Sequence, residues 1–434
     1  MIPPVAAPRF ERYLAQLRWL VEHPTPFTEP AAVSAMMSQV RDRMVRWLPG
    51  HACRIDSAGN LIAVPEALDG ALPLLYLSAH LDTVPSQPEL WAPPFAPHPP
   101  HESANELVAQ GVNDCKAGVA AQLWLAELAG SGALKLRNGV FMVTFKEEGA
   151  GEKSGVALGE AFGHALPRPT PGSTLLVLEN TVGSSSPHLP QIYASEASSF
   201  TIRLTGTLPE LQRAQEELRD WRPVSVLPIE DAPETYAWTR YTPQGHVCSA
   251  PPEANPLAAA LRQAGERALL RAGDERSHGT VPAEIGRAQA PRLGVRHRLT
   301  LTKRGIYDVE SVTAELNGRD YVAVKALALS GGFDASPRLP GYPVGRACTE
   351  LVAEGEAELA RNIGSSDATI ITSSLGAADR QALLPLVCGP GTRSQRSAVP
   401  PRLTHGPNET FVKSAGARSL ALILELLRRS GHAT

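Results

Sequence analysis

Side chains that could bind a metal or transfer a proton stand at the ends of three short apolar stretches of this sequence. They are His80, Asp82, Glu147, Glu148 and Glu179. Imidazole nitrogens and carboxylate oxygens are ligands that zinc takes in proteins. A single histidine at the end of a strand is more often a structural hydrogen-bonding residue. The residue types alone therefore leave a zinc site and a structural role both open.

The elements that must position these side chains show as three runs, LPLLYLSAH (72–80), GVFMVTFKEE (139–148) and STLLVLEN (173–180). Short, nearly continuous apolar runs are typical of strands buried on both faces of a mostly parallel sheet. Between the first two lies KAGVAAQLWLAELAG (116–130), which predicts a helix that ends in glycine. This order predicts an α/β domain, in which ligands bind beyond the carboxyl ends of the strands. One crevice could then collect all these polar residues.

The remainder of the chain suggests a split catalytic domain with an insertion. Amphipathic helices are expected over 10–22 and 31–48, a buried strand over 381–389 and a final helix over about 408–429. The middle segment is expected to be a smaller α+β unit. It holds strands such as SFTIRLTG (199–206) and HRLTLTKR (297–304), and helices at ELQRAQEELRDW (210–221) and NPLAAALRQAGERALL (255–270). The predicted boundaries are 1–195 and 336–434 for the catalytic domain and 196–335 for the insertion.

Composition narrows the class of protein. The 434 residues exceed the size at which single cores usually stop growing, so at least two structural units are expected. A formal net charge of -3 gives no electrostatic reason to expect a nucleic-acid or membrane partner, which favours a small-molecule substrate. The five cysteines form no CxxC pair, which argues against a disulfide framework or a thiolate zinc site and favours a cytoplasmic location. We expect an untargeted, soluble protein, because no apolar run approaches the roughly 20 residues of a membrane span.

Several motifs together resemble one known superfamily. They are SAHLDTVP (78–85), GVNDCKAG (111–118), TFKEEGAGEKSG (144–155), VLENT (177–181), and CGPG (388–391) followed by LTHGPNET (403–410). In order and spacing they resemble the dizinc metallopeptidases that include carboxypeptidase G, aminoacylase, acetylornithine deacetylase and succinyl-diaminopimelate desuccinylase. The resemblance implies a zinc-exopeptidase-like fold, with a mostly parallel sheet flanked by helices and interrupted by a smaller α+β lid domain.

The same resemblance implies two zinc ions per chain, with Co²⁺ or Mn²⁺ as possible substitutes. His80 and Glu179 would bind one zinc, Glu148 and His405 would bind the other, and Asp114 would bridge the two. A carboxylate suits this bridge, because its two oxygens can each take one metal ion at a separation of roughly 3.5 to 4 Å.

Further residues take roles around the metals by the same resemblance. Asp82 would accept the second ring N–H of His80, which fixes the tautomer of that histidine. Glu147 would be the general base that takes a proton from the attacking water. The peptide bond between Asp114 and Cys115 is expected to be cis, and Cys115 itself is expected to be a small packing residue.

The predicted lid carries weaker signals. GHVCSAPPEANPLAAAL (245–261) resembles the family's lid motif, which makes His246 the candidate for polarising the substrate carbonyl, either on lid closure or across a possible homodimer. A histidine at a strand-to-helix turn is the alternative. In GSSDATI (364–370), Thr369 stands where several deacylases carry an arginine for the substrate carboxylate. Arg393 and Arg396 could replace that arginine, although a solvated basic loop explains them equally well.

The sequence thus predicts a hydrolase that cleaves an amide bond with metal-activated water. A glutamate at position 179 is what the family's carboxypeptidases and deacylases, such as deacetylases, tend to carry. It favours a substrate with a free carboxylate next to the amide, either an acyl amino acid or a short peptide. An aminopeptidase or dipeptidase of the same fold is the first alternative. A binding protein that kept the site without catalysis is the second.

Overall fold

The computed structural model describes fourteen segments of the chain. They are residues 2–86, 88–148, 154–179, 189–196, 199–207, 225–229, 232–241, 276–284, 292–301, 307–316, 319–330, 333–362, 366–390 and 408–434. The chain divides into two compact units. The first comprises Met1–Ser195, Ala335–Asn362 and Ser366–Thr434, and the second comprises Glu196–Asp334 with Ile363–Ser365.

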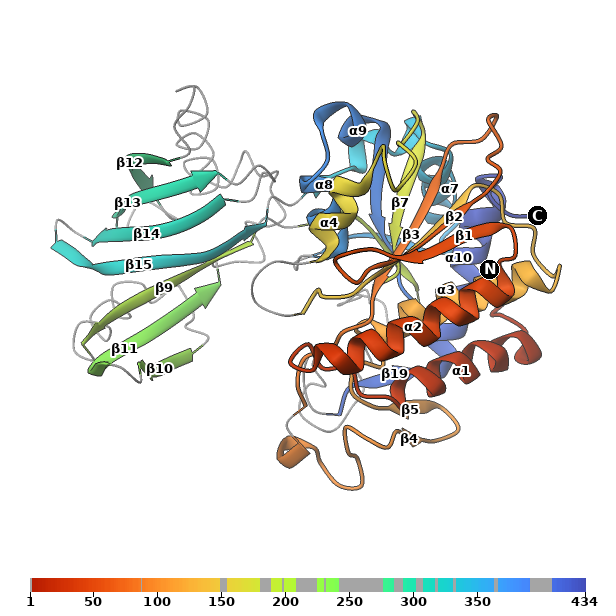
Figure 1. Ribbon diagram of the computed structural model, residues 1–434, viewed down its shortest axis with the longest axis horizontal. Coiled ribbons are helices and arrows are strands. Elements are labelled where there is room, and N and C mark those ends of the chain that lie inside the picture. Colours follow the sequence, from red (N-terminus) through yellow and green to blue (C-terminus); the bar gives the residue numbers. More distant parts are fainter. Residues whose placement is uncertain are drawn as a thin grey trace. The chain divides into compact units, whose positions relative to one another are not determined.

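The first unit combines helices with a twisted sheet (Figure 1). Its helices are α1 (Ala7–Val21), α2 (Pro30–Trp47), η1 (Pro88–Leu90), α3 (Lys116–Gly130), α4 (Ser154–Ala161), η4 (Ser336–Gly341), α7 (Pro343–Ala353), α8 (Asp367–Ser373), α9 (Ala377–Ala382) and α10 (Lys413–Arg429). Its strands are β1 (His51–Ile55), β2 (Leu61–Pro65), β3 (Leu75–His80), β4 (His101–Glu102), β5 (Glu106–Val108), β6 (Gly139–Thr144), β7 (Ser173–Val177), β8 (Gln191–Glu196), β17 (Glu358–Asn362), β18 (Leu383–Val387) and β19 (Thr410–Val412).

The main sheet of this unit runs in the order β1-β2-β6-β3-β7-β18-β8. Strand β3 pairs in parallel with β6 and with β7, and β18 pairs in parallel with β7. The neighbours on either side, β2 and β8, are antiparallel. Every residue of β3, β6, β7 and β18 is buried, which explains why their sequences are continuously apolar rather than alternating. The predicted α/β fold with a mostly parallel sheet is confirmed.

Helices flank this sheet, as Figure 1 shows for α1, α2 and α3, which pack together, and for α4 and α8, which pack together elsewhere on the unit. Helix α3 has the predicted bounds and is buried along nearly its whole length. Gly118 explains how closely it approaches the sheet, because a Cβ at this position would lie 2.1 Å from the main-chain oxygen of Leu178. Any larger residue would push α3 away from the end of β7.

Two features of the first unit differ from the sequence predictions. The hairpin of β1 and β2 was not predicted, and it adds two antiparallel strands beside β6. The final helix begins at Lys413, so the predicted start near 408 is wrong. Residues Thr410–Val412 instead pair as β19 with β5, in a small sheet of order β19-β5-β4. This pairing joins the C-terminal segment to the residues that precede the GVNDCKAG motif.

The second unit contains an antiparallel sheet of order β10-β11-β9-β15-β14-β13-β12. The strands of this sheet are β9 (Ser199–Thr207), β10 (Ser225–Ile229), β11 (Ala232–Tyr241), β12 (Arg276–Glu284), β13 (Arg292–Leu301), β14 (Tyr307–Leu316) and β15 (Arg319–Ser330). Strand β16 (Phe333–Asp334) ends the first of the two segments that form the unit. The strand expected at 199–206 corresponds to β9, and β13 covers the start of the one expected at 297–304. The helices expected at 210–221 and 255–270 lie outside the described residues.

Within the described ranges, no helix has both the length and the apolar character needed to cross a lipid bilayer.

Candidate active site

The carboxyl ends of three neighbouring strands bring the candidate residues to one edge of the main sheet. Because β6, β3 and β7 are adjacent and parallel, their carboxyl ends lie side by side. His80 is the last residue of β3, Glu147 and Glu148 follow β6, and Glu179 follows β7. The fold thus places these side chains at the edge where α/β sheets bind ligands.

His80 lies at the centre of this group and is 1% exposed. Its Nε2 lies 2.8 Å from Oδ1 of Asp114. Its Nδ1 lies 2.9 Å from the main-chain oxygen of Asp82 and 3.4 Å from Oδ1 of the same residue. Burial lowers the pKa of His80, but the hydrogen bonds to Asp114 and Asp82 and the negative charge of Asp114 oppose this effect, and the pKa is raised well above its usual value. The ring is therefore held at both nitrogens, with Nε2 directed at Asp114.

Asp82 also holds the loop that carries the two glutamates. Its Oδ1 accepts the backbone N–H of Glu147 and its Oδ2 accepts that of Glu148, each at 2.9 Å. The side chain of Asp82 is fully buried, so these hydrogen bonds form away from water and restrain the loop strongly. One carboxylate thereby sets the position of both glutamates relative to His80.

Asp114 lies in a loop with a cis peptide bond to Cys115, which confirms the predicted isomer. Three backbone N–H groups of this loop converge on the buried carboxylate of Glu409. Oε1 of Glu409 accepts from Asn113 at 2.7 Å and from Asp114 at 3.0 Å, and Oε2 accepts from Gly111 at 2.9 Å. Burial and the charge of Asp114 raise the pKa of Glu409 to about 8, while the three N–H donors oppose that rise.

Glu179 contacts the start of α8. Its Oε1 accepts the backbone N–H of Asp367 at 3.1 Å, and the carboxylate of Asp367 in turn accepts the hydroxyl of Thr144 at the end of β6. Burial raises the pKa of Glu179 well above its usual value; the charge of His80 opposes the rise, and the negative charge of Asp367 adds to it. Several carboxylates thus lie close together away from water, where their negative charges repel one another.

The donor set at this edge fits a divalent metal ion. Ligand atoms of His80, Glu147 and Glu148 lie within 4.8 Å of one another, and so do those of His80, Asp114 and Cys115. Buried carboxylates that repel one another are stabilised by a cation, and nitrogen and oxygen donors are those that zinc prefers. Sγ of Cys115 lies 3.5 Å from the main-chain oxygen of Leu178, and burial raises the pKa of its thiol well above the usual value. A neutral, buried thiol agrees with the packing role expected for Cys115.

The structure thus brings together four of the predicted site residues, His80, Asp114, Glu147 and Glu148, with Asp82 beside them. Glu179 belongs to neither three-residue group, although its pKa responds to the charge of His80. The other predicted residues, His246, Arg393, Arg396 and His405, lie outside the described residues.

Two buried carboxylates at the site had no predicted role. Glu409 and Asp367 lie within the motifs LTHGPNET and GSSDATI, in which the resemblance concerns only His405 and the position of Thr369. Neither motif is apolar, so no local pattern in the sequence distinguishes these two carboxylates. Their burial follows from contacts with residues far away in the sequence.

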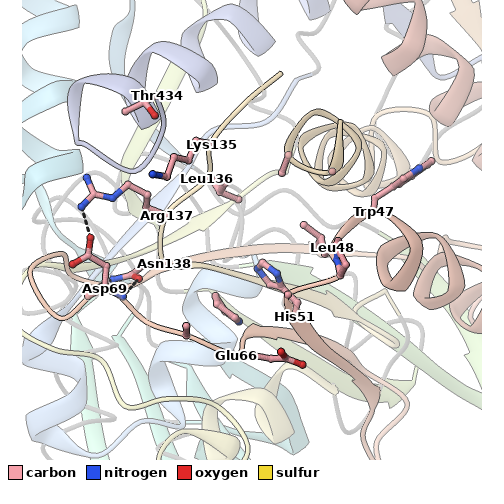
Figure 2. A pocket seen from close by; sticks show the side chains of 16 residues that line it. Trp47, Leu48, His51, Glu66, Asp69, Lys135, Leu136, Arg137, Asn138 and Thr434 are labelled. Carbon is pink, nitrogen blue, oxygen red and sulfur yellow. Dashed lines mark hydrogen bonds and ion pairs between the residues drawn. The ribbon is translucent and has the colours of Figure 1, made fainter. Parts of the chain in front are cut away.

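A pocket of about 650 Å³ lies at the opposite edge of the sheet, near the first residues of β6 (Figure 2). Its lining includes Trp47, His51 and the ion pair of Asp69 with Arg137. None of the candidate site residues within the described ranges lines it. By the rule that ligands of such sheets bind at the carboxyl ends of the strands, the chemistry belongs to the edge that carries His80.

The role of Asp82 can be tested with Asp82→Asn. An asparagine presents an NH₂ group to one of the two backbone N–H groups that the carboxylate accepts, so the loop of Glu147 and Glu148 must shift. We expect zinc affinity, measured by calorimetry, to fall by roughly 10 to 100-fold, as is typical when a residue that orients metal ligands is changed.

Asp69→Asn provides the matched control, because Asp69 accepts the backbone N–H of Ala71 at 3.0 Å and pairs with Arg137 at the other edge of the sheet. It should leave zinc affinity unchanged. Equal zinc affinity in Asp82→Asn and the unmodified protein would show that Asp82 does not organise the site.

The sequence of this chain matches one known protein family. A family model described as peptidase family M20/M25/M40 matches residues 76–429. A search of the curated proteins returned no match.

Solved structures share the fold at low sequence identity. Human carnosine dipeptidase 1 aligns with a TM-score of 0.58 and 12% identity, over 99% of this chain and 99% of that chain. The M20 family metallo-carboxypeptidase Sso-CP2 from Sulfolobus solfataricus aligns with a TM-score of 0.55 and 13% identity, over 96% and 99%. Aminopeptidase PepT from Bacillus cereus aligns with a TM-score of 0.52 and 14% identity, over 97% and 99%.

The family match covers most of the chain and confirms the resemblance drawn from the motifs. The chain therefore belongs to peptidase family M20/M25/M40 and is a metal-dependent hydrolase.

Proposed function

We propose that this protein uses two zinc ions to hydrolyse an amide bond in a small substrate that carries a free carboxylate next to that bond. N-acyl amino acids and short peptides cut at the C-terminal end are such substrates. The observation that carries the proposal is the meeting of His80, Asp114, Glu147 and Glu148 at the carboxyl ends of parallel strands, in a chain of the M20 family.

The metal ligands proposed are the five residues that the motif resemblance implies. His80 and Glu179 would hold one zinc, Glu148 and His405 the other, and Asp114 would bridge them. The burial of His80, its approach to Asp114 and the position of Glu179 at the end of β7 support this set. When bound, the two ions supply Lewis acidity, which makes a water molecule more acidic and stabilises the negative charge that develops on the substrate oxygen.

Glu147 is proposed as the general base. Its backbone is fixed by Asp82, and its carboxylate lies within 4.8 Å of ligand atoms of His80 and Glu148. From this position it would accept a proton from the attacking water and pass it to the leaving amine. Its burial, at 8% exposure, keeps bulk water from competing for that proton.

Residues for substrate recognition remain proposals from the motif resemblance. Arg393 or Arg396 would bind the substrate carboxylate, because a guanidinium group matches a carboxylate with two parallel hydrogen bonds. His246 would polarise the substrate carbonyl. Glu179, rather than aspartate, supports a substrate of the deacylase or carboxypeptidase type. An aminopeptidase or dipeptidase is the second candidate function, because the similar structures include an aminopeptidase and a dipeptidase.

Two neighbouring substitutions separate the base from the ligand. Glu147→Gln removes the proton acceptor but keeps the shape, so we expect full zinc content and turnover lowered by roughly 100 to 10,000-fold. Glu148→Gln should instead lose affinity for one zinc ion. Zinc stoichiometry and turnover in excess zinc check both variants. Zinc loss in Glu147→Gln with normal content in Glu148→Gln would show that the two roles are exchanged.

Substrate class is tested with matched pairs of compounds. The zinc-loaded protein is given N-acyl amino acids and dipeptides, each with a free or an amidated C-terminus, and the products are identified by mass spectrometry. We expect kcat/KM to be roughly 10 to 100-fold higher for the free acids, the worth of about one hydrogen bond to a charged group.

Glu147→Gln, purified in the same way, is the control for contaminating peptidases. A higher kcat/KM for dipeptides with a free amino terminus than for N-acyl amino acids, together with equal kcat/KM for free and amidated C-termini, would identify an aminopeptidase. No hydrolysis of any compound would favour a binding protein.

A further inference from the structure

We infer that Glu409 is a positioning residue for the bridging carboxylate of Asp114. By holding the loop that carries Asp114, Glu409 affects how tightly the metal ions are bound. The inference rests on the proposed function, because it concerns the zinc site proposed around Asp114. It adds a residue to which neither the motifs nor the comparisons assign a role.

The contacts of Glu409 are with the backbone of the loop that carries Asp114. Its two oxygens accept N–H groups from Gly111, Asn113 and Asp114 at 2.7 to 3.0 Å. The loop is thus wrapped around one carboxylate, as backbone N–H groups wrap around bound anions elsewhere. Glu409 is 2% exposed, so water does not replace these hydrogen bonds when they are lost.

Further contacts fix Glu409 itself. Its main-chain oxygen accepts the N–H of Ala109 at 3.2 Å, and the next residue, Thr410, accepts Nδ2 of Asn113 at 2.7 Å and pairs with Val108. Lys116 is buried close enough for its charge to interact with Glu409. The backbone of Glu409 is therefore held by pairing with the segment around Val108, and its side chain is held by three N–H donors.

The loop conformation depends on this arrangement. Gly111 has φ of 69°, in the left-handed region, and a Cβ there would lie 2.3 Å from Cγ2 of Thr83. This conformation is accessible to glycine and presents its N–H to Glu409. Asp114 is then restrained at both ends: its backbone N–H lies 3.0 Å from Glu409, and its Oδ1 lies 2.8 Å from Nε2 of His80.

A carboxylate is the side chain that this position requires. A carboxyl group has an oxygen at each end that can accept a hydrogen bond, whereas an amide accepts at one end only. In Glu409→Gln the NH₂ group must face either the N–H of Gly111 or those of Asn113 and Asp114. The loop has to move to separate these donors, and the bridging side chain of Asp114 moves with it.

The experiment compares Glu409→Gln with Glu102→Gln in the full chain. Glu102 also tethers the C-terminal segment, through an ion pair of 2.6 Å with Lys413, and its other side-chain hydrogen bonds come from Arg18. Zinc affinity is measured by calorimetry on protein stripped with chelator. The midpoint of thermal unfolding is measured in chelator and in excess zinc.

We expect zinc affinity to fall by roughly 10 to 100-fold in Glu409→Gln, as for other residues that orient metal ligands, and to be unchanged in Glu102→Gln. Weaker binding also reduces the rise in unfolding midpoint that zinc produces, because that rise depends on the ratio of zinc concentration to the dissociation constant. A purely structural Glu409 would lower the midpoint equally with and without zinc. That result, with unchanged zinc affinity, would overturn the inference.

Glu409→Asp covers the case in which the glutamine variant does not fold. It keeps the charge but withdraws the carboxylate by one methylene, so it should weaken zinc binding in the same direction; unchanged affinity in this variant also contradicts the inference. Absence of zinc binding by the unmodified protein would overturn both the proposed function and this inference. Normal zinc binding by the unmodified protein and by the Glu409 variants alike would overturn this inference alone.

Discussion

Buried carboxylates that accept backbone N–H groups hold the loops of the candidate site. Asp82 fixes the backbone of Glu147 and Glu148, and Glu409 fixes the backbone of Asp114. An N–H group buried without a partner is costly, so each of these carboxylates enforces one loop conformation. The parallel strands bring the loops to one edge of the sheet, and the carboxylates then set the positions of the side chains within it.

This arrangement concentrates negative charge in a poorly solvated volume, which is unfavourable unless a cation is present. The raised pKa values of His80 and Glu179 are two signs of that crowding. A divalent ion offsets the repulsion, so a site of this kind is stable when loaded and responsive to small shifts of its supporting residues. The supporting carboxylates, Asp82 and Glu409, are therefore expected to affect how tightly the metal ion is bound.

Much of this arrangement follows from local sequence patterns. Continuous apolar runs predicted β3, β6 and β7, and the motifs predicted that His80, Glu147 and Glu148 would meet. The β1–β2 hairpin was missed because each strand has only five residues, β1 carries His51 and Arg54, and β2 ends in a proline. Glu409 was missed because its partners, Gly111 to Asp114, lie nearly 300 residues earlier. Neither local propensity nor motif spacing reveals a hydrogen bond formed over that distance.

The proposed mechanism requires two metal ions that share Asp114 at the carboxyl ends of β3, β6 and β7. Diffraction from zinc-loaded crystals, recorded on both sides of the zinc absorption edge, tests it most directly. We expect two anomalous peaks that both contact Asp114, one also contacting His80 and the other Glu148, with Glu147 contacting neither. Zinc found only at other places on the molecule, or bound through Glu147 in place of Glu148, would contradict it.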